Sequence, residues 1–404
     1  MRFQVLSIAV VAAGLMTACV SSAPTSAPET RITAPASQSG QLVRFEPIDH
    51  LERASLQQTA SGLPGAIAVN NGVRLYRLIY RSSVRGQAID ASALVAVPDT
   101  QGPPRGAVLY LRGSDIPRSA APTTPNAIWT SEAAVFGGNG FVTIVPDYIG
   151  FGASPSPQAF LLTDENVADF RAALTAAQSA LALGRHTPLF VTGFSQGGQL
   201  SAALHRDLDA RPLRGYDLRE TVAVAGPHEL VGSFAARIEE PLASNPIAMG
   251  YVAWAAYTFA WREGRPLEEV FAPAYVAQAP RWFGGSMSMQ ELLGQAPGSI
   301  TEILRPEFLA SIRTDRDFWF NRMVRENETY EWTPRAPFHI ILGTADDHVD
   351  PAATRILYER ARARGGNVSI QEFPGFNHLQ TGGAAYAPTL ARFEALAEAS
   401  SAQR

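Results

Sequence analysis

Short apolar runs recur along most of the chain and are separated by longer segments with the spacing of amphipathic helices. The runs lie at residues 107–111, 141–145, 189–191, 221–225, 338–342 and 368–373. The helical segments between them include residues 165–183, 198–208 and 351–364. Alternation of this kind predicts an α/β fold, in which a mostly parallel sheet is covered on both faces by helices.

Two earlier runs, at residues 73–81 and 88–97, also have β character, and the polar segment 82–86 joins them. They predict an antiparallel pair of strands. With 404 residues, of which 46% are hydrophobic, the chain can form a large core. We expect one α/β domain at residues 42–404.

A long insertion interrupts the alternation at about residues 230–336, between the fourth and fifth of the later runs. It contains an aromatic-rich segment at 249–261 and helix-like segments at 287–295 and 306–325. Taken singly, each aromatic residue is most simply a packing residue. As a group they favour a helical cap over an apolar pocket, which would exclude water and select substrates.

The first residues have the pattern of a signal peptide. Arg2 gives a positive start, residues 5–15 are apolar but too short to span a bilayer comfortably, and the run LMTAC at 15–19 resembles a bacterial lipobox. We expect a signal peptide at 1–18 and a lipid on the thiol of Cys19. An ordinary secretory signal or an uncleaved anchor is the alternative. Cys19 is the only cysteine, so no disulfide forms within the chain.

Residues 19–41 are mostly Ser, Ala, Pro and Thr and predict a flexible tether, because they offer too little apolar surface to bury. Val20, rather than an aspartate, follows Cys19. By resemblance to Gram-negative lipoproteins, this favours the outer membrane and a domain that faces the periplasm, with a secreted protein as the alternative. The small net charge of −4 and the lack of a basic block argue against nucleic acid as a partner.

The strongest chemical signal is the run GFSQG at residues 193–197, between an apolar strand and a predicted helix. A serine on such a sharp turn holds its hydroxyl clear of the sheet, and glycines at both flanks leave room for the close turn. We therefore expect Ser195 to be a nucleophile. One oxyanion donor would be the backbone N–H of Gln196, and the second the N–H of Ser114 or Gly113, after an earlier strand.

A serine nucleophile needs a base, and the base needs a carboxylate that orients it. Such residues should follow strand ends that converge on Ser195. Asp346, Asp347 and Asp350 follow the strand at 338–342, and His378 ends the loop after 368–373.

Two other groups of polar residues follow predicted strands. Asp346, Asp347, His348 and Asp350 could also be read as a metal site, but adjacent residues in a turn point in different directions and no second cluster supports it. His228 and Glu229 were expected at a polar edge of the pocket. We expect no metal and no cofactor.

Five motifs together resemble the secretory-lipase-like branch of the α/β-hydrolase superfamily: YLRGS, VPDYIGFGAS, GFSQGG, GTADDHV and GFNH, within residues 80–378. The resemblance implies an eight-stranded sheet with the cap after strand six and a triad in the order Ser195, Asp346, His378. It also places Asp147 and Tyr148 near the site, where we expect them to have structural roles. One departure is Arg112-Gly113, where relatives usually have His-Gly.

The resemblance implies a serine hydrolase that cleaves carboxylic esters, with a small-molecule ester as its substrate. A peptidase or acyltransferase would use the same triad. A non-catalytic envelope-binding lipoprotein is the alternative outside enzymes. The oligomeric state is left open by the sequence.

Overall fold

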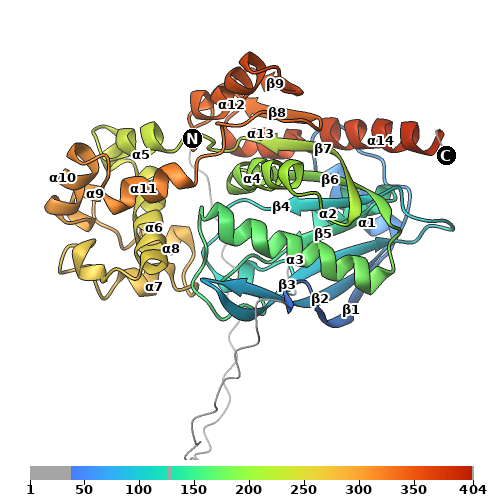
Figure 1. Cartoon of the computed structure of the whole chain (residues 1–404), viewed down its shortest axis with the longest axis horizontal. Helices are drawn as coiled ribbons and strands as arrows, with labels where there is room; N and C mark the ends of the chain where they lie inside the picture. Colours follow the sequence, from blue (N-terminus) through green and yellow to red (C-terminus); the bar gives the residue numbers. More distant parts are fainter. Residues whose placement is uncertain (1–37, 125–129, 403–404) are drawn as a thin grey trace, which may run out of the picture. The chain divides into compact units, whose positions relative to one another are not determined.

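A computed structural model describes residues 38–124 and 130–402 (Figure 1). Its centre is one sheet of nine strands in the order β1-β2-β3-β5-β4-β6-β7-β8-β9. The strands are β1 (Leu42–Leu51), β2 (Val73–Val84), β3 (Gln87–Pro98), β4 (Ala107–Leu111), β5 (Val142–Pro146), β6 (His186–Phe194), β7 (Gly215–Val224), β8 (Phe338–Gly343) and β9 (Val368–Phe373). The pairs β1–β2, β2–β3 and β3–β5 are antiparallel, and the rest of the sheet is parallel.

The predicted antiparallel pair is confirmed as β2 and β3, but the connection is shorter than expected. Both strands continue into the polar segment, so that only Arg85 and Gly86 form the turn, with φ of 50° and 72°. Two central residues with positive φ match the right-handed twist of a hairpin.

The expected count of eight strands is wrong by one, because β1 adds an antiparallel strand at the edge. The cap consequently follows the seventh strand, β7, rather than the sixth. Most side chains of β1 are exposed or only half-buried, so its sequence lacks the apolar alternation that would have marked it as a strand. Just before β1, the backbone of Gly40 and Gln41 already bonds to that of Arg81.

Helices cover both faces of the sheet. On one face lie α3 (Thr163–Leu181) and α4 (Gln196–Ala210), whose apolar residues form one core cluster with the strands. On the other lie α1 (Arg53–Ser61), α2 (Thr130–Val135) and α14 (Tyr386–Ala402). The central strands β4, β5 and β8 are buried along their whole length, as expected for parallel strands between two helical layers.

Two helices near the carboxyl end complete this part of the structure, and short 3₁₀ turns occur elsewhere. The helices are α12 (Pro351–Ala363) and α13 (His378–Ala384). The 3₁₀ turns are η2 (Arg118–Ala120), η4 (Gly137–Asn139), η5 (Leu242–Ser244) and η6 (Leu267–Glu269).

The insertion forms a cap of helices α5 to α11, which gather beyond one end of the sheet in Figure 1. They are α5 (Val231–Arg237), α6 (Pro246–Glu263), α7 (Ala279–Phe283), α8 (Met289–Leu293), α9 (Ile300–Ile303), α10 (Pro306–Thr314) and α11 (Trp319–Glu326). The segment 306–325, expected as a single helical stretch, is divided into α10 and α11. Within residues 38–124 and 130–402, no helix combines the length and the apolar character needed to cross a membrane.

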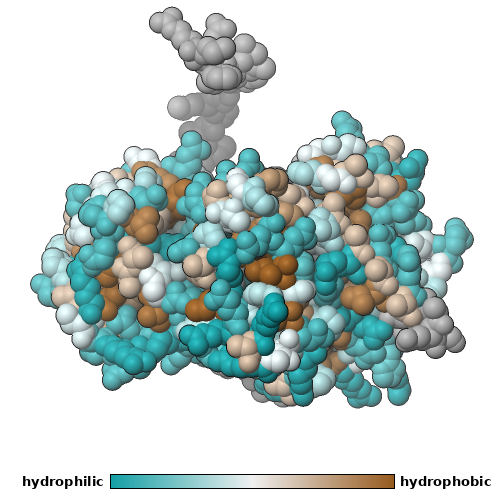
Figure 2. All heavy atoms as spheres, turned by 90° about the horizontal axis from the view of Figure 1, so that it is seen from above, coloured by the Kyte–Doolittle hydropathy of each residue, from teal (hydrophilic) through white to brown (hydrophobic). Residues whose placement is uncertain are grey.

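The aromatic residues of the cap form a hydrophobic cluster with the loop that precedes α3. Trp254 of α6 stacks on Phe160 with ring centroids 4.0 Å apart, and Phe259, Trp282 and Phe320 are buried in the same cluster. Packing therefore accounts for these aromatics. On the face seen in Figure 2, hydrophobic side chains form small separate patches among hydrophilic ones.

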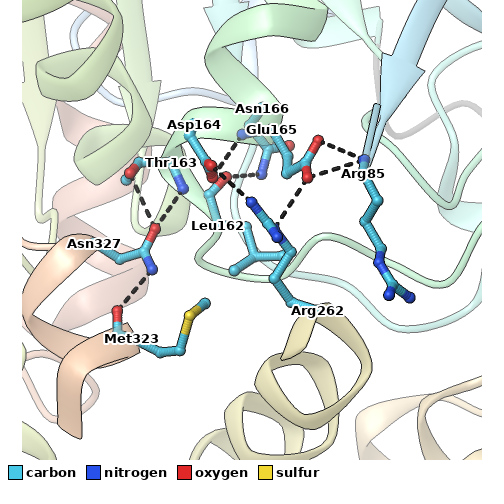
Figure 3. Close-up of polar contacts among 9 residues, drawn as sticks. All are labelled: Arg85, Leu162, Thr163, Asp164, Glu165, Asn166, Arg262, Met323 and Asn327. Atoms are coloured by element: carbon cyan, nitrogen blue, oxygen red, sulfur yellow. Dashed lines mark hydrogen bonds and ion pairs between the residues drawn. The ribbon is translucent and has the colours of Figure 1, made fainter. Parts of the chain in front are cut away.

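The cap is joined to the start of α3 by two different kinds of polar contact (Figure 3). Asn327, just after α11, is buried and accepts hydrogen bonds from the backbone N–H of Thr163 at 2.7 Å and from its hydroxyl at 3.0 Å. Arg262 of α6 forms ion pairs with Glu165 at 3.0 Å and Asp164 at 3.2 Å. Leu162, at the N-cap position of α3, has no side chain that could cap the helix. Asn327, which belongs to the cap insertion, instead accepts the hydrogen bond at the N-terminus of α3.

Replacement of Asn327 by Ala should therefore lower the free energy of unfolding by about 2–3 kcal/mol, because it leaves the N–H of Thr163 buried without an acceptor. The matched change Arg262→Gln removes the two ion pairs of a partly exposed arginine and should cost less than about 1 kcal/mol. Urea unfolding of both variants measures the difference. Equal losses would contradict the capping role of Asn327.

Candidate active site

Ser195 lies on a strained turn between β6 and α4, as the GFSQG run predicts. Its φ is 59° and its ψ −120°, a conformation that a residue with a side chain rarely adopts. A Cβ on Gly193 would lie 2.5 Å from the carbonyl oxygen of Gly197, and a Cβ on Gly197 would lie 1.8 Å from that of Leu111. The backbone N–H of Ser195 donates to the carbonyl of Val224 at 2.8 Å. Only glycine fits at either flank, and the turn presents the serine beyond the strand end.

His378 and Asp346 are brought together, although 32 residues separate them in the sequence. His378 is the first residue of α13, which begins with a capping box between Asn377 and Gln380. Its Nδ1 lies 2.8 Å from Oδ2 of Asp346, and both side chains are almost fully buried. This bond orients the imidazole and leaves its Nε2 for a reacting group.

The three aspartates that follow β8 have different partners. Oδ1 of Asp346 accepts hydrogen bonds from the N–H groups of His348 and Val349, each at 2.9 Å. Asp347 accepts from the backbone N–H of His378 at 3.3 Å. Asp350 caps α12 by accepting from the N–H of Ala352 at 2.8 Å. Of the three, only Asp346 has its carboxylate hydrogen-bonded to the His378 ring.

His348, which the sequence suggested only as a possible metal ligand, stacks on His378. The ring centroids are 4.7 Å apart with an interplanar angle of 15°, and Phe194 contacts His378 at 4.6 Å. Burial, followed by the charge of a protonated His378, lowers the pKa of His348 and favours its neutral form. Among the described residues, no group of three or more His, Cys, Asp or Glu side chains could hold a metal ion.

A small pocket adjoins Ser195. Ser195, Gln196 and Ser114 line it from the sheet side. The cap and neighbouring loops supply its other lining residues: Phe160, Leu161, Pro227, Leu230, Ser233, Phe234, Arg237, Tyr251, His348 and Val349. Most of these are apolar, as the expected cap over an apolar pocket requires. The sequence did not single out the individual lining residues, because nothing in a helical pattern says which face meets the pocket.

The loop after β4 runs beside Ser195. A Cβ built on Gly113 would lie 3.6 Å from the Cβ of Ser195, and Ser114 lines the same pocket as Ser195. The N–H of Gln196 is at the first position of α4, where no carbonyl within the helix can accept it. These groups can supply the backbone donors of an oxyanion hole.

Arg112 precedes this loop and is buried, with 1% of its surface exposed. Its guanidinium donates to the carbonyls of Gly113 at 3.2 Å and Asp147 at 3.0 Å, and it lies 4.8 Å from the ring centroid of Tyr148. The Tyr148 hydroxyl donates to the carbonyl of Arg112 at 2.9 Å. The unusual arginine thus braces the loop that carries the expected oxyanion donors.

The contacts of Asp147 and Tyr148 fit the structural roles expected of them. The carboxylate of Asp147 is fully buried and accepts hydrogen bonds from the hydroxyl of Ser92 and from both the N–H and the hydroxyl of Thr123. The expectation for His228 is wrong, because it is completely buried and bonds to Thr329 at 2.8 Å rather than lining the pocket edge. Cys19, the signal peptide and most of the predicted tether lie outside the described residues.

Comparisons with known proteins bear on the family and the fold of the chain. The sequence profile described as "Alpha/beta hydrolase family" matches residues 119–398. No protein of curated function matches the chain by sequence.

Similar solved structures cover nearly the whole chain. A Legionella pneumophila protein considered a hydrolase has a TM-score of 0.80 at 22% identity, covering 88% of this chain and 98% of its own. The rice cell wall degrading esterase LipA from Xanthomonas oryzae has 0.73 at 18%, covering 89% and 97%. Candida antarctica lipase A in its closed state has 0.71 at 12%, covering 91% and 85%. At these identities the likeness is one of fold.

The close approach at the turn predicts a large effect of one methyl group. Gly197→Ala should destabilise the protein by at least about 3 kcal/mol or prevent folding, because its Cβ overlaps the Leu111 carbonyl. Gly184→Ala is the control, since no atom lies within 4 Å of its added Cβ, and it should change stability by less than about 0.5 kcal/mol. Urea unfolding, or the yield of folded protein, measures both. Similar stability of the two variants would contradict the described turn.

The burial of His228 predicts that the free energy of unfolding decreases at acidic pH. Burial lowers its pKa to about 3, below the usual value of 6.5, so between these values the unfolded chain binds more protons than the folded protein. This contribution to stability is complete at neutral pH and falls as the pH drops below about 6.5, by up to about 1.4 kcal/mol per pH unit. His228→Asn should therefore lose less stability than wild type between pH 7 and pH 4. Urea unfolding at both pH values measures this, with exposed His186→Asn as a control that should follow wild type.

Proposed function

Because the chain belongs to the alpha/beta hydrolase family, we propose that it hydrolyses carboxylic esters, with Ser195 as nucleophile, His378 as base and Asp346 as the carboxylate that orients the base. The observation that carries the proposal is the hydrogen bond between Nδ1 of His378 and Asp346, next to a strained serine turn at the floor of an apolar pocket. Ester substrates with apolar groups suit the lining of that pocket.

The reaction proceeds in two halves. His378 takes the proton of the Ser195 hydroxyl as its oxygen attacks the ester carbonyl, and the resulting imidazolium is stabilised by Asp346. The tetrahedral intermediate collapses to an acyl-enzyme, and the alcohol leaves with the proton from His378. Water then attacks the acyl-enzyme by the same route and releases the acid.

The negative charge of each tetrahedral intermediate is held by backbone N–H groups of Gln196 and Ser114. Each such donor contributes roughly 3 kcal/mol to the transition state. Arg112 supports this step by bracing the loop through the carbonyls of Gly113 and Asp147. A braced donor costs little reorganisation when the charge develops.

The test uses p-nitrophenyl butyrate and a set of substitutions that change little in shape. Ser195→Ala should abolish turnover, and Asp346→Asn should reduce kcat by about 10³-fold to 10⁴-fold, because the amide no longer fixes the imidazole in the required tautomer. Asp347→Asn is the matched control, since its carbonyl oxygen still accepts the backbone N–H of His378. It should retain activity within about threefold.

Two outcomes would contradict the proposal. Turnover that persists in Ser195→Ala would exclude this serine as the nucleophile. A larger loss in Asp347→Asn than in Asp346→Asn would exclude the assignment of the acid. Circular dichroism of each variant separates these results from misfolding.

A further inference from the structure

The pocket beside Ser195 has one charged corner in an otherwise mostly apolar lining. That corner consists of Arg237 at the end of α5, Tyr251 of α6 and His348. The pKa of Tyr251 is raised to about 12, chiefly by burial, while the charge of Arg237 lowers it. The lowered pKa of His348 favours its neutral form, as described above. Among the described residues that line the pocket, Arg237 is therefore the one with a permanent positive charge.

The guanidinium of Arg237 uses only part of its hydrogen-bonding capacity within the protein. It donates to the carbonyl of Ser233 at 2.9 Å and to that of His348 at 2.8 Å. Arginine has five N–H donors, so others are left for a ligand. Among the described residues, no carboxylate lies within ion-pair distance of this side chain. Many other arginines of the chain form an ion pair with an aspartate or a glutamate.

Three acidic groups act electrostatically on Arg237 without forming an ion pair with it. Asp346, Asp350 and Glu229 are close enough to act on its pKa, which burial lowers. Each already has partners: Asp346 and Asp350 those described above, and Glu229 the backbone N–H groups of Gly232 and Ser233. These three carboxylates line a second hollow, which Arg237 also lines, and none of them lines the pocket of Ser195. An anion in the pocket of Ser195 would therefore meet Arg237 and none of these carboxylates.

We infer that Arg237, assisted by the Tyr251 hydroxyl, binds a carboxylate of the substrate, so that the preferred substrates are carboxylic esters carrying a second, free carboxylate. The inference rests on the proposed esterase function and narrows its substrate class. A planar guanidinium matches a carboxylate with two parallel hydrogen bonds, and the apolar surroundings strengthen the attraction. An apolar substrate of the same shape would leave these donors without a charged partner.

Arg237 could instead serve only to hold the loop of His348, to whose carbonyl it donates. The two roles differ in what they do to different substrates. A structural role affects every ester alike, whereas recognition affects only those with the negative charge. The ratio of kcat/KM between a charged ester and its neutral isostere therefore separates them.

The experiment compares methyl succinate half-ester with methyl succinamate, which places the charge on the acyl side. It also compares O-acetylglycolate with O-acetylglycolamide, which places the charge on the alcohol side. Release of acid is followed in a pH-stat at pH 7.5 for wild type, Arg237→Gln, Arg237→Lys and Arg313→Gln. Arg313 is a matched cap arginine that pairs with Glu239 and does not line the pocket.

In wild type the carboxylate should be preferred over the amide by at least about tenfold in one of the two pairs. Arg237→Gln should reduce that ratio to about one while the amide esters change by less than about threefold. Arg237→Lys should retain part of the preference, and Arg313→Gln all of it.

The inference is overturned by the absence of a preference in both pairs, by a preference that survives Arg237→Gln, or by an equal loss on charged and neutral esters. Failure of the esterase function itself gives a different result, because wild type and Ser195→Ala would then be equally inactive on all four esters and on p-nitrophenyl butyrate.

Discussion

The site depends on one close approach between backbone atoms, where the first turn of α4 meets the end of β4. The Leu111 carbonyl lies so near Gly197 that a Cβ there would be 1.8 Å away. The loop of Arg112, Gly113 and Ser114 begins at the next residue after Leu111. The contact between the Leu111 carbonyl and Gly197 therefore fixes the position of the serine turn relative to the loop beside it. The strain at Ser195 is maintained by this packing and by its hydrogen bond to Val224.

Asp346 and His378 lie at the same edge of the sheet, but different local contacts hold each of them. The carboxylate of Asp346 is held by two backbone N–H groups of its own turn, and the His378 ring lies at the start of a capped helix. His348 and Phe194 contact that ring. A side chain held in this way loses little freedom when it reacts, which is the physical content of a preorganised site.

Much of this arrangement could be predicted from the sequence, for reasons specific to the residues involved. The buried parallel strands are short apolar runs, and their carboxyl ends meet at one edge, so Ser195, Asp346 and His378 could be grouped without knowing a contact. The edge strand β1 could not be found in this way, because it is largely exposed and lacks the alternation. The division between α10 and α11 was also missed.

The pocket residues of the cap were hidden for a different reason. Arg237 belongs to a short helix and Tyr251 to a mostly apolar one, and the orientation of both helices is set by tertiary packing, not by their own periodicity. Asn327 likewise caps a helix that starts 164 residues earlier in the chain. Contacts of this range follow only from the folded arrangement of cap and sheet.

The central claim is that Ser195 and the backbone N–H groups of Gln196 and Ser114 act on one tetrahedral centre. The most direct measurement is a crystal structure of the protein after reaction with a p-nitrophenyl alkylphosphonate, which mimics that centre. We predict a bond from phosphorus to the Ser195 oxygen, with the phosphoryl oxygen about 3 Å from both backbone nitrogens. Attachment to another residue such as Ser233, or a phosphoryl oxygen directed away from both N–H groups, would contradict the account.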